Sequence, residues 1–334
     1  MSELIFRAKD IDLVKWDKLI TSSPVANWFQ THEAYSFFES LSFLETFAFA
    51  VETENKLKGV VVGYIQKDGG KLKQYFSKRA IINGGPILAD NITDEELKAL
   101  LGALKTRLKQ KAIYIESRNF CDYKRWRNVF ESCGFKFESH YDVHVDTSSM
   151  EVVNENMGKS RKRDVRVSFR DGAVVISEPT FRQIGEFYLI LKDLYKSKVK
   201  MPLVPLEFFE KLNNQPSSKF LLIEYRGEII GGTVCVGLCG HAVYEMYACG
   251  KDGTYKNIFP SEVATYAAIQ YAAENGFKLF DMMGAGKPDD GGYGVRDFKL
   301  KFGGELMELG RYSYVCNPLL YNIGSLAVKI MKKV

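Results

Sequence analysis

The sequence has few residues of the types that build metal centres or disulfide frameworks. Its 334 residues include only four histidines and six cysteines, and no two cysteines stand in a C-x-x-C arrangement. This composition excludes the common zinc sites and predicts free thiols in a reducing compartment. We therefore expect neither a metal ion nor a disulfide.

Several catalytic signatures and all long apolar runs are missing as well. The chain has no G-x-S-x-G, no H-E-x-x-H, no Walker A sequence and no G-x-G-x-x-G after a strand, which argues against several large enzyme classes. Apolar runs such as residues 59–65 are too short to cross a bilayer, and residues 1–10 lack the apolar core of a signal peptide. We expect a cytoplasmic protein that could still touch the inner face of the membrane.

The composition of the chain is that of a well-packed globular protein. Hydrophobic residues make up 46% and charged residues 26%, as in ordinary folded domains. The length predicts two domains, which we place at residues 1–150 and 151–334. The net charge is +5, of which +4 falls after residue 150. An anionic partner is therefore expected to bind the second half.

Both halves show a similar order of elements, namely a helix, antiparallel strands, a helix and a strand. In the first half, strands are predicted at 46–51, 59–66, 79–86, 111–117 and 135–145, and helices at 11–41 (broken near Pro24), 93–110 (opened by a Thr93/Glu96 capping box) and 123–133. In the second half, strands are predicted at 172–177, 219–225, 229–238, 241–249 and 277–282, and helices at 181–198, 206–213 and 261–275. This order predicts an α+β fold with two architecturally similar domains.

The segment from Asp281 to Gly304 carries the strongest indication of a functional site. A strand ends in a Gly-rich loop, and a short element then presents Arg296, Phe298 and Lys299. Glycines permit positive φ and close approach of a substrate to the backbone. A surface loop with solvated lysines would have the same pattern, and we favour that interpretation for Lys301.

The joint between the halves, residues 146–170, contains the densest basic run of the chain. Its cations are Lys159, Arg161, Lys162, Arg163, Arg166 and Arg170. A run of this kind fits a solvated helix face and fits contact with phosphate or RNA about equally well.

The Gly-rich segment resembles the same region of the FemABX peptidoglycan-bridge aminoacyltransferases, in which a strand and a Gly-rich loop precede a Phe-Lys pair. Phe298-Lys299 falls on that pair. Similarity continues upstream in residues 159–163, 169–172, 187–188, 205–209, 244–248 and 260, and more weakly in 29–31 and 84–86. The resemblance implies two GNAT-like (acyl-CoA N-acyltransferase-like) domains side by side with a cleft between them.

The resemblance also implies an activity and a set of site residues. Such an enzyme transfers an amino acid from aminoacyl-tRNA to an amine of a UDP-linked or lipid-linked muramyl peptide. Lys299 would stand beside the oxyanion or guide the tRNA 3′ end, and Phe298 would position it. The substrate-binding candidates are Tyr247, Arg296, Asp297, Lys198, Gly84 and Gly85, and the anion or tRNA contacts are Lys159, Arg161, Lys162 and Arg163. Tyr247 could equally well be a packed core residue instead of a pocket residue. Asp297 could be an ordinary exposed aspartate that contacts only water.

The chain departs from the family pattern at two places that concern the acceptor. Residues 36–38 are Ser, Phe and Phe where the family can carry a phosphate-binding lysine, and Lys198 or Lys200 stands where an arginine is expected. The sequence therefore does not identify the acceptor substrate.

Two rival functions remain on the same fold. One is a CoA-dependent N-acyltransferase, which is disfavoured because residues 251–260 do not fit the Arg/Gln-x-x-Gly-x-Gly/Ala loop that holds the CoA pyrophosphate. We therefore expect no cofactor. The other rival is a non-catalytic relative that keeps the cleft as a binding site.

Overall fold

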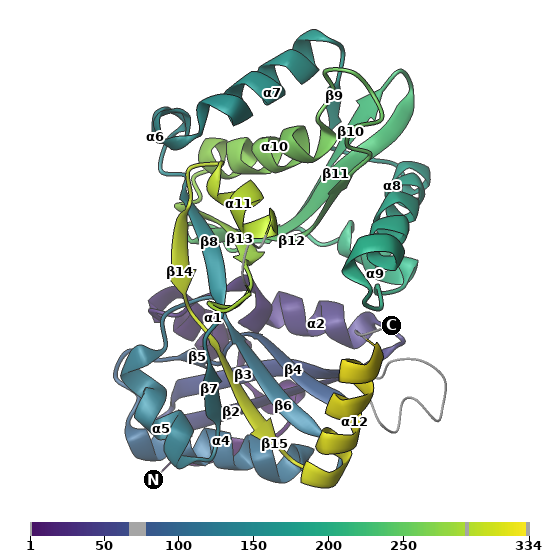
Figure 1. Ribbon diagram of the computed structural model, residues 1–334. Coiled ribbons are helices and arrows are strands. Elements are labelled where there is room, and N and C mark those ends of the chain that lie inside the picture. The colour runs from purple at the N-terminus through teal and green to yellow at the C-terminus, as the bar shows by residue number, and fades with distance from the viewer. Residues whose placement is uncertain (1, 67–77, 291–293, 332–334) are drawn as a thin grey trace. The chain divides into compact units, whose positions relative to one another are not determined.

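The computed structural model describes residues 2–66, 78–290 and 294–331. The chain folds into two α+β units, each built around one mixed sheet (Figure 1). The first unit extends to Ser139 and takes up the chain again from Leu309, and the second unit holds His140 to Glu308. In the described parts of the chain, no helix is long and apolar enough to cross a membrane.

The sheet of the first unit has the strand order β1-β2-β3-β4-β6-β15-β7, with β5 paired to β3. Its strands are β1 (Glu3–Ile5), β2 (Leu44–Thr53), β3 (Lys56–Gln66), β4 (Arg79–Gly84), β5 (Ile87–Leu88), β6 (Tyr114–Asn119), β7 (Lys136–Glu138) and β15 (Arg311–Val315). The predicted hairpin is β2–β3, and its two turn residues, Glu54 and Asn55, have φ of 51° and 60°. Two consecutive positive φ values are typical of the tight turns that match the twist of paired strands.

Helices cover both faces of this first sheet. The described helices are η1 (Ala8–Asp10), α1 (Leu13–Ser22), η2 (Trp28–Gln30), α2 (His32–Ser40), α4 (Asp94–Leu108), η3 (Lys124–Trp126), α5 (Arg127–Ser132) and α12 (Pro318–Met331). On one face α4 packs its leucines against Val61 and Ile65. On the other face α2 packs Phe38 against Tyr64, with ring centres 4.9 Å apart. Successive side chains of β3 point to opposite faces of the sheet, so Ile65 packs with α4 and Tyr64 packs with α2.

The second unit repeats the layered plan around the order β14-β8-β13-β12-β11-β10-β9. Its strands are β8 (Tyr141–Asp146), β9 (Val174–Ile176), β10 (Ser218–Tyr225), β11 (Glu228–Gly237), β12 (Ala242–Gly250), β13 (Leu279–Gly284) and β14 (Glu305–Glu308). Its helices are α6 (Met150–Asn156), α7 (Lys159–Arg170), α8 (Phe181–Leu194), the π-helical η4 (Tyr195–Val199), α9 (Leu206–Leu212), α10 (Pro260–Glu274) and α11 (Gly294–Leu300). Both α10 and α8 pack against β11 and β12, and α7 lies on α10 (Figure 1).

The division of the chain differs from the expected domains 1–150 and 151–334. The predicted strand 135–145 is two strands: β7 pairs with β15 in the first unit, and β8 pairs with β13 and β14 in the second. The chain then returns, because β15 inserts between β6 and β7. Residues 140–150 therefore belong to the second unit and residues from 309 to the first.

Candidate functional site

The ammonium of Lys299 is hydrogen-bonded to the C-terminal end of one strand, β13. Lys299 lies on α11, directly after the Gly-rich loop, and its Nζ donates hydrogen bonds to three consecutive carbonyl oxygens of β13. The distances are 2.5 Å to Met282, 3.1 Å to Met283 and 2.9 Å to Gly284. The bonds to the two methionines are partly buried, whereas the bond to Gly284 is exposed.

A local distortion of β13 turns these carbonyls toward the lysine. The pairing of β13 with β8 shifts register between Asp281 and Gly284, and Met283 adopts a left-handed φ of 55°. The fully buried Asp281 supports this turn, since its Oδ1 accepts the Met283 N–H at 2.6 Å. Asp281 thus fixes the strand end that receives the Lys299 ammonium.

A histidine on the neighbouring strand faces the same carboxylate. The Nε2 of His144, on β8, lies 3.4 Å from Oδ2 of Asp281, and the His144 side chain is 14% exposed. Burial by itself lowers the pKa of His144, but Asp281, together with Asp142 and Glu305, raises it overall. The pair therefore favours a protonated imidazole next to Asp281.

A second buried carboxylate, Glu245 on β12, lies within electrostatic range of Lys299. Its Oε1 accepts the hydroxyl hydrogens of Thr233 at 3.2 Å and Thr265 at 3.0 Å. Burial raises the pKa of Glu245, and the positive charge of Lys299 opposes that rise. Burial lowers the pKa of Lys299, while Glu245, Asp142 and Asp281 oppose this lowering. The acidic surroundings thus offset part of the cost of burying the ammonium.

The residues around Lys299 on α11 hold the helix and loop in place. Phe298 packs against Phe302 with ring centres 5.3 Å apart. Arg296 donates to the carbonyl oxygens of Ala285 at 2.8 Å and Lys287 at 2.6 Å, so it ties α11 to the Gly-rich loop. Asp297 is exposed.

The predicted anion contacts divide into one buried residue and three exposed ones. Arg161 is only 7% exposed, forms an ion pair with Glu262 on α10, and stacks its guanidinium 4.4 Å from the Phe298 ring centre. This differs from the expected surface role, because the inward face of α7 carries Arg161 into the α10 interface. Lys159, Lys162 and Arg163 are exposed on the outer face of α7.

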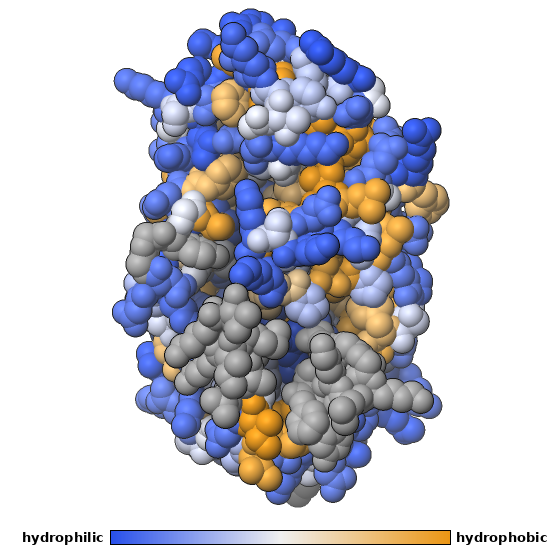
Figure 2. All heavy atoms as spheres, turned by 45° about the vertical axis from the view of Figure 1, so that its right-hand side comes forward, coloured by the Kyte–Doolittle hydropathy of each residue, from blue (hydrophilic) through white to orange (hydrophobic). Residues whose placement is uncertain are grey.

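Tyr247 and Lys198 lie in an aromatic part of the second unit. The Tyr247 ring centre is 5.0 Å from that of Phe209, 5.8 Å from Phe208 and 6.3 Å from Tyr195, so packing contributes to its position. Lys198 is exposed on η4. Hydrophobic residues show at the surface between hydrophilic ones on the face that carries α8 (Figure 2).

Gly84 and Gly85 belong to the first unit, and their positions there have a packing explanation. Their φ values are 81° and 75°, and an added Cβ would lie 2.1 Å from Oδ1 of Asn27 at Gly84 and 2.6 Å from Cζ of Tyr123 at Gly85. The turn after β4 therefore requires glycine at both positions. The predicted contact of Gly84 and Gly85 with substrate stays a prediction.

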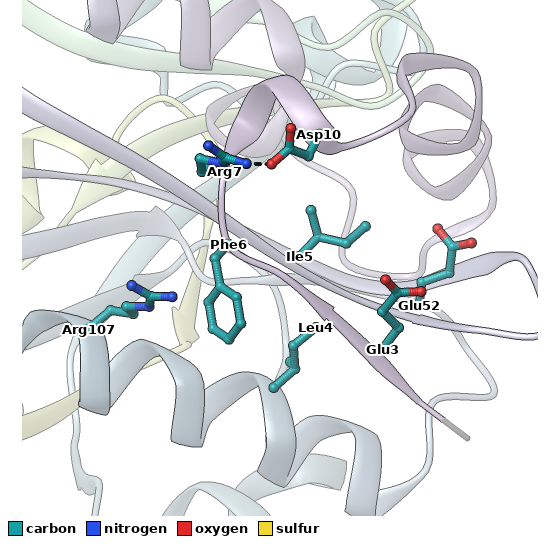
Figure 3. A pocket seen from close by; sticks show the side chains of 8 residues that line it. All are labelled: Glu3, Leu4, Ile5, Phe6, Arg7, Asp10, Glu52 and Arg107. Atoms are coloured by element: carbon teal, nitrogen blue, oxygen red, sulfur yellow. Dashed lines mark hydrogen bonds and ion pairs between the residues drawn. The ribbon is translucent and has the colours of Figure 1, made fainter.

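A shallow hollow of about 650 Å³ lies beside the edge strand of the first unit (Figure 3). Its floor is formed by Leu4, Ile5 and Phe6, and the Arg107 guanidinium stacks 4.3 Å from the Phe6 ring centre. The Arg7–Asp10 ion pair closes one side at 2.8 Å. None of the predicted site residues lines this hollow. Within the described ranges, no three His, Cys, Asp or Glu side chains gather in a way that could hold a metal ion.

Three residues of the site were not predicted, namely His144, Glu245 and Asp281. Glu245 and Asp281 are each the one charged residue of their strands, and His144 stands between two valines on β8. A buried polar residue among apolar neighbours is the signal that could have identified them.

Comparison with known proteins finds one family model and several solved structures that are similar to this chain. The sequence model of the FemAB family matches residues 222–329, which include Phe298 and Lys299. No curated protein matches the sequence significantly. The crystal structure of FemX is 15% identical, covers 96% of this chain and 99% of its own, and has a TM-score of 0.73.

Two further solved structures share the fold at low identity. The C-terminal domain of a putative lysylphosphatidylglycerol synthetase from Agrobacterium fabrum is 11% identical, with 96% of each chain covered and a TM-score of 0.59. A tandem GNAT protein from the clavulanic acid biosynthesis pathway is 9% identical, with 95% of this chain and 99% of its own covered and a TM-score of 0.60.

These similarities confirm the predicted fold class of two GNAT-like domains. The FemAB family model matches about a third of the chain, and the FemX structure shares the fold of the whole chain. More particularly, the family match and the FemX fold support a FemABX-like family, as the Phe298-Lys299 motif predicted.

Proposed function

We propose that this protein transfers an amino acid from aminoacyl-tRNA to an amine of a UDP-linked or lipid-linked muramyl peptide, with Lys299 as the catalytic cation. The observation that carries this proposal is the ammonium of Lys299 at the turned end of β13. The reaction would take place in the cytoplasm, or at the inner face of the membrane if the acceptor is lipid-linked.

The chemistry needs no covalent intermediate on the enzyme. The acceptor amine attacks the ester carbonyl, the C–O bond to the tRNA breaks, and an amide forms. The attacking nitrogen loses a proton and the departing 3′-oxygen gains one. An activated ester therefore requires mainly close placement of amine and carbonyl and stabilisation of the oxyanion.

Lys299 is arranged so that one of its hydrogen bonds can be exchanged. The partly buried bonds to Met282 and Met283 hold the ammonium, and the exposed bond to Gly284 is the one that an oxyanion would replace. Burial lowers the pKa of Lys299, and the nearby carboxylates offset part of this lowering. Phe298 supports this geometry by anchoring α11 through Phe302.

The N-terminus of α10 supports a donor other than CoA. In that position a CoA pyrophosphate would need free N–H groups. Here Asp252 already accepts from the Ser261 N–H at 3.1 Å and from its hydroxyl at 2.5 Å, while Pro260 has no N–H to offer. A pyrophosphate at this helix end would meet a carboxylate.

The test of this function is a transfer assay with the intact protein. Total tRNA charged with labelled amino acids is incubated with a UDP-linked muramyl peptide, and a parallel reaction contains labelled acetyl-CoA. We expect label from the tRNA to appear on the peptide. Labelling from acetyl-CoA alone, or from neither donor, would overturn the proposal.

A further inference from the structure

One side of α7 carries an uninterrupted basic stripe. Its exposed cations are Lys159, Lys162, Arg163, Arg166 and Arg170. Spacings of three and four residues place all five on one face of the helix. The opposite face is buried against the rest of the unit, and its residues are Arg161, Asp164, Val165 and Ser168.

Little negative charge balances this stripe. Arg163 pairs with Asp164 at 2.8 Å and Arg170 with Asp171 at 2.7 Å, but both arginine side chains remain 65% exposed. In the part of the chain that the structure describes, Lys159, Lys162 and Arg166 have no acidic partner. The stripe therefore presents net positive charge to solvent.

The N-terminal end of α7, where the stripe begins, lies beside α11, the helix that carries Lys299. The N–H of Gly158, which precedes α7, donates to the Lys301 carbonyl at 3.0 Å, and Arg161 stacks on Phe298. From there the 12 residues of α7 extend along α10 (Figure 1). At 1.5 Å per residue the helix is roughly 18 Å long. A long anion that lies along α7 would thus have one end next to α11.

We propose that this stripe binds the sugar-phosphate backbone of the tRNA donor, with the acceptor end directed toward Lys299. The inference rests on the proposed function. A regular row of cations on one helix face suits the evenly spaced phosphates of a nucleic acid backbone and needs no contact with bases. A membrane would use the same charges, but it would not require the stripe to adjoin α11.

The test compares tRNA binding by the wild type with that by a neutralised variant, Lys162→Gln/Arg166→Gln/Arg170→Gln. Binding of uncharged tRNA is followed by fluorescence anisotropy over a series of salt concentrations. Each lost phosphate contact reduces the slope of log affinity against log salt by roughly 0.7 to 0.9. We expect a slope reduced by about 2 and binding weaker by about tenfold or more at 0.1 M salt.

A matched control removes the same charge from the first unit. Lys18, Lys98 and Lys109 are exposed there, and Lys18→Gln/Lys98→Gln/Lys109→Gln should bind tRNA as the wild type does. Equal binding by the stripe variant and the wild type would overturn the proposal. So would a stripe variant that keeps tRNA binding but loses binding to phosphatidylglycerol vesicles, since the stripe would then be a membrane surface.

The transfer assay separates this inference from the proposed function. If amino acid is transferred from charged tRNA while the stripe variant binds tRNA normally, the binding surface is wrong and the function stands. If tRNA binds through the stripe but no amino acid is transferred, the surface stands and the function is wrong.

Discussion

The ammonium of Lys299 is a partly buried charge with backbone carbonyls and carboxylates around it. Carbonyls of β13 accept its hydrogen bonds, and Glu245 and Asp281 supply negative charge nearby. Such a lysine differs from a freely solvated one, because removing it leaves carbonyls without a donor. Its substitution should therefore affect stability as well as any activity.

Asp281 should be among the residues on which this site depends most. Its carboxylate is fully buried, accepts the Met283 N–H and faces His144. Asp281→Asn leaves the largely buried imidazole of His144 without its charge partner, so we expect the free energy of unfolding to fall by about 2–4 kcal/mol. Urea unfolding measures this loss. Asp297→Asn, at an exposed position of α11, is the control and should stay within about 0.5 kcal/mol of the wild type; similar losses in both variants would contradict the role of Asp281.

His144 should make part of the stability dependent on pH. Because its pKa is raised in the folded protein, its contribution is complete below the unfolded-state pKa of about 6.5 and is lost as pH rises through the folded pKa. His241 acts in the opposite direction, since burial and Lys278 lower its pKa. The difference in unfolding free energy between the wild type and His144→Gln should therefore shrink as pH rises above about 6.5. A difference that grows as pH rises would contradict a raised pKa for His144 in the folded protein.

At the scale of elements, helix ends show which local signals are decisive. The predicted capping box at the start of α4 is present, with Thr93 and Glu96 each bonded to the other's backbone N–H. At the start of α10, by contrast, the N–H of Ser261 is bound by Asp252, which lies nine positions earlier in the chain and outside the helix. A cap from a preceding loop has no fixed spacing, and the sequence could not reveal it.

The occupied end of α10 leads to a prediction about the donor. The carboxylate of Asp252 accepts hydrogen bonds from the N–H and the hydroxyl of Ser261 at this helix end. The wild type should therefore not bind acetyl-CoA at micromolar concentrations, as measured by calorimetry. Asp252→Asn removes the negative charge and tests whether that charge contributes to exclusion. Micromolar binding of acetyl-CoA by the wild type would contradict the donor assignment and favour the CoA-dependent reaction.

Strands and helices with local patterns could be predicted, whereas pairings between distant segments could not. The hairpin β2–β3 and the helix α4 follow from alternation and capping within a short stretch. The insertion of β15 between β6 and β7 joins segments far apart in the sequence, as in the pairing of Arg311 with Arg118. The polar residues His144 and Asp281 become a pair only because β8 and β13 are neighbours. Lys299 could be singled out by its motif, but its carbonyl partners could not.

At the scale of the whole molecule, the chain forms two sheets of similar plan and returns to the first after completing the second. The candidate catalytic residues Phe298 and Lys299, the carbonyls of β13 and the basic stripe of α7 all belong to the second unit. The second unit therefore holds the groups on which the proposed chemistry depends, and the account depends most on Lys299.

The most direct test of the account is the turnover of Lys299→Met in the tRNA-dependent transfer assay. Loss of a charge that stabilises the oxyanion should lower kcat by about a hundredfold or more and change KM for the acceptor much less. Lys301→Met, at an exposed position two residues on, should retain activity. Melting temperature is measured for both, and kcat is compared at a temperature where each variant is folded. Equal activity of the two folded variants would contradict a catalytic role for Lys299.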